Sequence, residues 1–220
     1  MSNSIKEGIN YHNEVGKAGD FNNLNNEAEI LHLLRKKENP YERCPIYVSK
    51  SFIFRMVEGK DAENLLECYS DSKAAKLFNS DNCTSDFIYK SLEEIKNCIK
   101  FWIDQYNEKY YVRFSIIDKL NNKAIGTIEF FAKQVDYNGI FRVGVLRLDL
   151  VSRYENEETI AEILEIVNNN FYDDFEVKHV ITKAIPIATQ RVAALEKESY
   201  IKLEDKTIVP YDSYFIRYKH

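Results

Sequence analysis

Apolar positions along the 220-residue chain switch between the spacing typical of strands and the spacing typical of helices. The clearest helical spacing follows Ser91, which forms a capping-box pattern with Glu94 ahead of apolar residues three and four positions apart. Helices are predicted at residues 60–70, 91–106, 157–171 and 188–198. Strands are predicted at residues 52–57, 110–117, 124–132, 140–151, 177–184, 200–203 and 213–218.

The order of these elements predicts the architecture of the sheet. The Asn138-Gly139 pair lies between two strand-like runs and indicates a hairpin. The helix at 157–171 then connects two strands as a crossover, so an antiparallel meander leads into a β-α-β unit. The fold class is therefore α/β (α+β), a mixed, mostly antiparallel central sheet of about six to seven strands flanked by helices.

Residues 1–48 differ from the rest of the chain and are predicted to form an N-terminal extension. Up to about residue 26 they are rich in Asn, Gly and Lys and indicate a flexible arm. Residues 27–37 predict a short amphipathic helix with the apolar side chains Ile30, Leu31, Leu33 and Leu34. Because so short a helix is marginal alone, we expect it to dock on the domain at 49–220 or on a second copy, as a homodimer.

Composition narrows the class of protein. A hydrophobic fraction of 45% and a charged fraction of 30% are typical of a folded domain. No apolar run approaches the roughly 18 residues of a membrane-spanning helix, and the polar N-terminus predicts no secretory signal. A net charge of -5 argues against a nucleic-acid partner. The four cysteines and four histidines lack metal-ligand spacing, which predicts no metal site and free thiols in a reducing cytoplasm.

Three stretches resemble the GNAT superfamily of N-acetyltransferases, and within it the branch that acetylates ribosomal-protein N-termini. They are FIFRMVEGKDAENLLECYSD at 52–71, FSIIDKLNNKAIGTIEF at 114–130 and LEKESY at 195–200. The resemblance runs from about Phe52 to Tyr218. It implies the GNAT fold and direct transfer of an acetyl group from acetyl-CoA to an amine, without a covalent enzyme intermediate.

The resemblance also implies where acetyl-CoA binds. GNAT proteins hold the pyrophosphate on a glycine-containing loop between the fourth strand and the next helix, where backbone N–H groups approach the phosphates. Here Asn156 and Glu158 replace the two glycines, and the Asn-x-x-Ser pair that often contacts the CoA arm reads Ala188 and Arg191. The cofactor-binding residues that the resemblance implies are Leu150, Val151, Arg153, Tyr154, Asn156, Glu158, Thr159 and Arg191.

The altered loop has an interpretation that needs no ligand. Carboxylates at a helix N-terminus are stabilised by about 0.3–1 kcal/mol each, so the glutamates at 155, 157 and 158 suit a helix start by themselves. Side chains at the glycine positions crowd the backbone, and the carboxylates repel phosphate. We therefore expect weak or absent acetyl-CoA binding on this loop.

Two functions remain open at this point. The first is an acyl-CoA-dependent N-acetyltransferase that acts on a small-molecule or peptide amine. Its general base would be Glu129 or Asp149, and the backbone of residues 148–151 would stabilise the oxyanion. The second is a catalytically inactive GNAT-fold protein, a binding or regulatory module that has lost the acetyl-CoA pyrophosphate loop.

Overall fold

A computed structural model describes residues 38–83, 87–136 and 140–219, and the predicted helix at 27–37 lies outside these ranges. The compact unit begins at Glu38. Its strands are β1 (Tyr47–Val48), β2 (Phe52–Met56), β3 (Val112–Asp118), β4 (Lys123–Asp136), β5 (Ile140–Leu150), β6 (His179–Lys183), β7 (Ile201–Lys202) and β8 (Tyr214–Tyr218). Its helices are α2 (Ala62–Ser70), α3 (Leu92–Asn107), α4 (Glu157–Ile166), α5 (Tyr172–Asp174) and α6 (Thr189–Lys197), with short 3-10 turns η2 (Gly59–Asp61), η3 (Ala75–Leu77) and η4 (Ser152–Tyr154).

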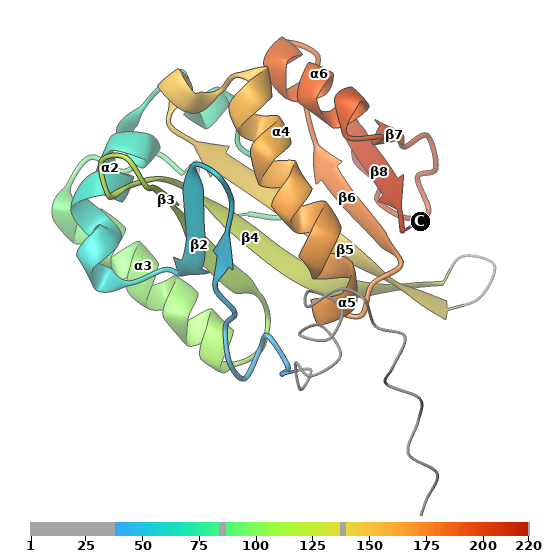
Figure 1. Ribbon diagram of the computed structural model, residues 1–220, viewed down its shortest axis with the longest axis horizontal. Coiled ribbons are helices and arrows are strands. Elements are labelled where there is room, and N and C mark those ends of the chain that lie inside the picture. Colours follow the sequence, from blue (N-terminus) through green and yellow to red (C-terminus); the bar gives the residue numbers. More distant parts are fainter. Residues whose placement is uncertain (1–37, 84–86, 137–139, 220) are drawn as a thin grey trace, which may run out of the picture. The chain divides into compact units, whose positions relative to one another are not determined.

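The strands form one mixed sheet in the order β1-β2-β3-β4-β5-β6-β8-β7 (Figure 1). Neighbouring strands are antiparallel except for β5 and β6, which the α4 crossover makes parallel. The predicted fold class is confirmed. The sheet has eight strands rather than about six to seven, and the additional strand is the two-residue β1 at one edge.

The unpredicted strand β1 lies inside the segment that was expected to form the extension. Its Tyr47 side chain is buried against the rings of Phe114 and Phe171, and the hydroxyl donates to Asp174 at 2.6 Å. Residues 38–48 therefore belong to the compact unit, and the boundary falls before β1 rather than after residue 48. A two-residue strand carries too little alternation to be recognised in a sequence.

Side chains that alternate along β3 show which helices cover which face of the sheet. Phe114 contacts Phe171, which follows α4 in the chain. Its neighbour Arg113 points to the other face and stacks on Trp102 of α3. Helices α2 and α3 therefore cover one face, and α4 with α6 beside it covers the other (Figure 1).

Two helices show how far capping and apolar spacing in the sequence predict helix boundaries. The capping box at the start of α3 is confirmed, because the Ser91 hydroxyl accepts from the Glu94 N–H while Glu94 accepts from the Ser91 N–H. The helix predicted over 157–171 is instead α-helical only to Ile166 and continues as a π-helical turn, Val167–Phe171. The wider turn still buries Phe171, so the apolar pattern did not reveal the change. In the described ranges no helix is both long and apolar enough to cross a membrane.

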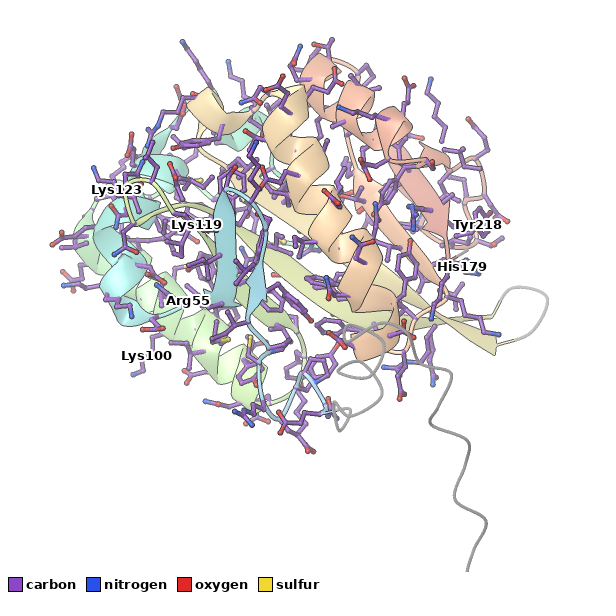
Figure 2. All side chains as sticks on the ribbon, viewed as in Figure 1. Arg55, Lys100, Lys119, Lys123, His179 and Tyr218 are labelled. Carbon is purple, nitrogen blue, oxygen red and sulfur yellow. The ribbon has the colours of Figure 1, made fainter. Side chains whose placement is uncertain are left out.

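The two ends of the sheet differ in what they carry. Lys119 and Lys123 flank the tight turn between β3 and β4 (Figure 2). His179 and Tyr218 pair across β6 and β8, with ring centroids 4.8 Å apart (Figure 2). His179 begins β6, so this pair lies at the opposite end of that strand from Lys183, where the candidate site begins.

Gly126 allows β4 and β5 to approach each other next to the candidate site. A Cβ atom at this position would lie 2.0 Å from the Asp149 carbonyl oxygen and 2.9 Å from the Leu150 Cα. Since neither main-chain atom can move freely, we expect Gly126→Ala to lower the free energy of unfolding by about 1–3 kcal/mol. Gly59→Ala is the matched control, because nothing lies within 4 Å of its Cβ position, and its change should stay within about 0.5 kcal/mol. Urea unfolding of both variants measures the difference, and equal losses would contradict this account of Gly126.

Candidate functional site

The candidate site is a fork between the parallel strands β5 and β6. Their pairing runs from Val143 opposite His179 to Leu146 opposite Thr182 and ends there. Beyond that point β5 continues to Leu150 with β4 as its partner, while β6 stays with β8. Main-chain groups of β5 that face away from β4 are therefore available to other partners in the fork.

Arg191, in the first turn of α6, fills the fork. Its guanidinium donates to the Leu148 carbonyl oxygen at 3.0 Å and to the Leu77 carbonyl oxygen at 3.1 Å. It also forms an ion pair with Glu155, and both side chains are buried. One side chain thus joins α6, the open edge of β5, the end of η3 and the segment ahead of α4. Arg191, a predicted site residue, lies in the fork and is bound to the protein itself.

Several N–H groups of the loop before α4 already have hydrogen-bond partners within the chain. The Asn156 side chain caps the helix by accepting from the Thr159 N–H at 3.0 Å, and the Glu157 N–H donates to the Gln190 side chain at 3.2 Å. Glu157 and Glu158 occupy the first turn, where the helix dipole favours carboxylates. In the present conformation this loop does not fit a diphosphate, since its first turn carries carboxylates and the N–H groups of Glu157 and Thr159 already have partners.

The side chains of four other predicted cofactor residues are engaged elsewhere in the fold. Arg153 is exposed and pairs with Glu67 of α2. The Tyr154 hydroxyl donates to Asp118, at the end of β3, at 2.6 Å. Leu150 and Val151 are buried in the core.

Asp71, at the end of α2, holds the chain where it leaves β5. Its carboxylate accepts from the Ser152 N–H at 2.9 Å and from the N–H groups of Lys73 and Ala74 at 2.9 and 3.2 Å. Burial acts to raise the pKa of Asp71, but these hydrogen bonds outweigh it and lower the pKa to about 2. The ionised carboxylate is therefore the form that the fold stabilises.

This arrangement predicts an acid-sensitive contribution to stability. The pKa of Asp71 is lower in the folded chain than in the unfolded one, so its contribution is complete above about pH 4 and is lost as the pH falls towards about 2. Asp71→Asn should cost about 1–2 kcal/mol at neutral pH. The gap between the two proteins in urea unfolding should close on acidification. A gap that is constant between neutral pH and about pH 2 would show that the charge of Asp71 is not involved.

The predicted base candidates Glu129 and Asp149 meet on the α2/α3 face of the sheet. Strand register places Arg113 opposite Glu129, Glu129 opposite Arg147, and Thr127 opposite Asp149. Arg113 forms ion pairs with both carboxylates, at 3.3 Å to Asp149. The sequence therefore identified two residues of one buried cluster, whose arginines it did not identify.

The two carboxylates differ in how far they are satisfied. Glu129 is bound by Arg113 on one oxygen and by Arg147, at 2.8 Å, on the other. Asp149 accepts from the Tyr69 hydroxyl at 2.8 Å through Oδ2, while its buried Oδ1 has no hydrogen-bond partner in the described part of the chain. Burial raises the pKa of Asp149, and Arg113 opposes the shift. Asp149 is thus the carboxylate with a lone pair available to accept a proton.

A charged residue within an apolar strand was the available signal for the residues that were missed. Arg113 follows Val112 and precedes Phe114 in a strand that is buried throughout. Such an arginine needs buried acidic partners, and Glu129 and Asp149 were already candidates. Its pairing with them depends on register, which the pattern alone does not give.

The fold was compared with known proteins. No family model and no curated protein matches the sequence. Among solved structures, a GNAT-family acetyltransferase from Bacillus anthracis aligns with a TM-score of 0.59 at 17% identity, over 80% of this chain and 99% of that one. The ribosomal-protein-S5-alanine acetyltransferase from Vibrio fischeri aligns with a TM-score of 0.59 at 11% identity, over 80% and 97%.

A third similar structure contains coenzyme A. The RimL ribosomal L7/L12 α-N-protein acetyltransferase in complex with coenzyme A aligns with a TM-score of 0.59 at 12% identity, over 79% of this chain and 98% of that one. Together these likenesses show that the chain has the GNAT fold. The predicted resemblance is confirmed at the level of the fold.

Proposed function

We propose that this chain is an acyl-CoA-dependent N-acyltransferase of the GNAT type whose donor site is closed in the present conformation by Arg191. The observation that carries the proposal is the fork itself. Leu148 turns its carbonyl towards the fork, and the adjacent Asp149 keeps a free carboxylate oxygen on the α2/α3 face. The open main-chain edge of β5 can position an amine, and the neighbouring Asp149 carboxylate can remove its proton. Both are needed for acyl transfer to an amine.

The roles of the chain's own residues follow from this geometry. Asp149 accepts the proton of the acceptor amine through Oδ1, while Tyr69 and Arg113 fix its other oxygen. Arg113 holds Glu129 as well, so Glu129 acts as a positioning residue rather than as the base. The acceptor is a small-molecule or peptide amine. The ribosomal-protein acetyltransferases among the structural neighbours support a peptide.

A second candidate function is a GNAT-fold binding or regulatory module that transfers no acetyl group. The specific observation in its favour is that the fork and the loop are both occupied by the chain's own charges. Arg191 takes the Leu148 carbonyl and Glu155, and Glu157 and Glu158 stand at the helix start. In this case Asp149 and its neighbours are structural.

Acetyl transfer itself separates the two functions. The chain is incubated with millimolar acetyl-CoA and a panel of peptide and small amines, and acetylated products are identified by mass spectrometry. The transferase is expected to give slow product formation that Asp149→Asn lowers by about 100-fold or more, the contribution of a general base. Thr127→Ser is the control, because it retains the hydroxyl that Tyr69 contacts. The same assay is run on the double variant Glu155→Gln with Arg191→Ser, which removes the ion pair that fills the fork. If neither the wild type nor this variant gives product, the binding module is the better description.

A further inference from the structure

The two arms of the fork present cations on the α2/α3 face. Val145 and Ile181 are paired residues of β5 and β6. Because side chains alternate along a strand, the next positions on the same face are Arg147 on β5 and Lys183 on β6. These two side chains therefore flank the opening of the fork on the face that also carries Asp149.

Asp81 contacts both of these cations, with its carboxylate on Lys183 and its main-chain oxygen on Arg147. Asp81 accepts from the Lys183 ammonium at 2.7 and 2.9 Å through its two oxygens, and from the Tyr214 hydroxyl at 3.1 Å. Arg147 donates to the main-chain oxygen of Asp81 at 2.8 Å. The side chains of Lys183 and Asp81 are 20% and 14% exposed, so solvent reaches the pair only in part.

Asp81 completes the charge balance of this cluster of side chains. Arg113, Arg147 and Lys183 contribute three positive charges. Glu129 and Asp149 contribute two negative charges, which leaves an excess of one positive charge without Asp81. A partly buried excess charge is unfavourable, so a group that takes the place of the Asp81 carboxylate is favoured when it is negatively charged.

We propose that Lys183 and Tyr214 form a carboxylate-binding site beside Arg147, on the acceptor side of the fork, which the Asp81 side chain occupies in this conformation. The inference rests on the proposed function and specifies it: the acceptor is an amine that also carries a carboxylate group. Asp149 follows Arg147 by two residues on the same face, about 7 Å along β5. The carboxylate of the acceptor would bind at Lys183 while its amine lies towards Asp149.

The site is tested by direct binding to the full chain without an acyl donor. The probes are ω-amino carboxylates of increasing length and the matching carboxamides, with dissociation constants measured by NMR titration. Asp81→Asn keeps the shape of the side chain and removes its charge. It should bind a carboxylate probe at least about tenfold more tightly than the wild type does, because the internal competitor is gone. The carboxamide should bind no better, and adding Lys183→Met to Asp81→Asn should abolish the gain.

Two results would overturn the site. Asp81→Asn could bind carboxylate and carboxamide alike, which would leave the Asp81–Lys183 pair as a structural contact. The gain could also survive Lys183→Met, which would place the ligand elsewhere. If Asp81→Asn does not fold, binding of a millimolar carboxylate probe is compared between the wild type and Lys183→Met. Weaker binding by Lys183→Met supports the site, and equal binding overturns it. Carboxylate binding without acetyl transfer would refute the proposed enzyme and leave the site intact.

Discussion

Replacing Arg113 by methionine is expected to lower the free energy of unfolding by about 3–5 kcal/mol, the cost of breaking a buried ion pair on one side. The guanidinium is buried against Trp102 and neutralises Glu129 and Asp149. Methionine fills much of the same volume but leaves both carboxylates without this partner. The carboxylates would then have to take up protons or recruit water, and either response costs stability.

Arg153→Met is the matched control for this experiment. Arg153 also pairs with a carboxylate, that of Glu67, but both side chains are about half exposed, at 48% and 52%. A solvent-exposed pair contributes at most about 1 kcal/mol, so this variant should unfold close to the wild type. Both variants are compared by urea unfolding. Similar small losses of unfolding free energy for the two variants would show that the buried ion pairs of Arg113 contribute no more to stability than an exposed pair does.

The double change Asn156→Gly with Glu158→Gly is expected to raise the affinity for acetyl-CoA by about 5- to 150-fold, which corresponds to about 1–3 kcal/mol. It removes one carboxylate from the first turn of α4 and places glycine at both positions where the resemblance to the GNAT superfamily implies it. Removal of the Asn156 cap frees the Thr159 N–H for a phosphate oxygen. Calorimetric titration with acetyl-CoA measures the change.

Glu165→Gly controls for the effect of glycine on the helix. Glu165 is exposed and lies near the other end of α4. Glycine at this position lowers helix stability by a similar amount without altering the loop. Its affinity for acetyl-CoA should equal that of the wild type. If the loop variant also equals the wild type, the loop is not what limits acetyl-CoA binding.

The sequence predicted the fold through signals that are local. The capping box at Ser91 and the apolar spacing after it are contained within one helix, and α3 forms as expected. The hairpin signal at Asn138-Gly139 is confirmed by the pairing of the flanking residues Asp136 and Ile140, although the turn itself lies outside the described residues. Elements whose stabilising contacts are close in sequence could be predicted from pattern.

The site depends on contacts between distant residues, and these were predicted only in part. Arg191 was expected at the cofactor site by resemblance, but its bonds to Leu148, Leu77 and Glu155 join four segments that no local pattern relates. Glu155 was interpreted as a charge that suits a helix start, whereas it is buried against Arg191. Local helix propensity and a long-range ion pair can both favour glutamate at the same position. Only the tertiary structure shows which of the two interactions the side chain makes.

The account rests on the claim that the Arg191–Glu155 pair closes a donor site that the fold otherwise provides. Changing both residues together, as Glu155→Gln with Arg191→Ser, leaves neither charge uncompensated and frees the Leu148 carbonyl. The decisive measurement is calorimetric titration of acetyl-CoA into this double variant and the wild type. The account predicts binding at least about tenfold tighter in the variant. A folded variant that binds acetyl-CoA no better than the wild type would contradict it.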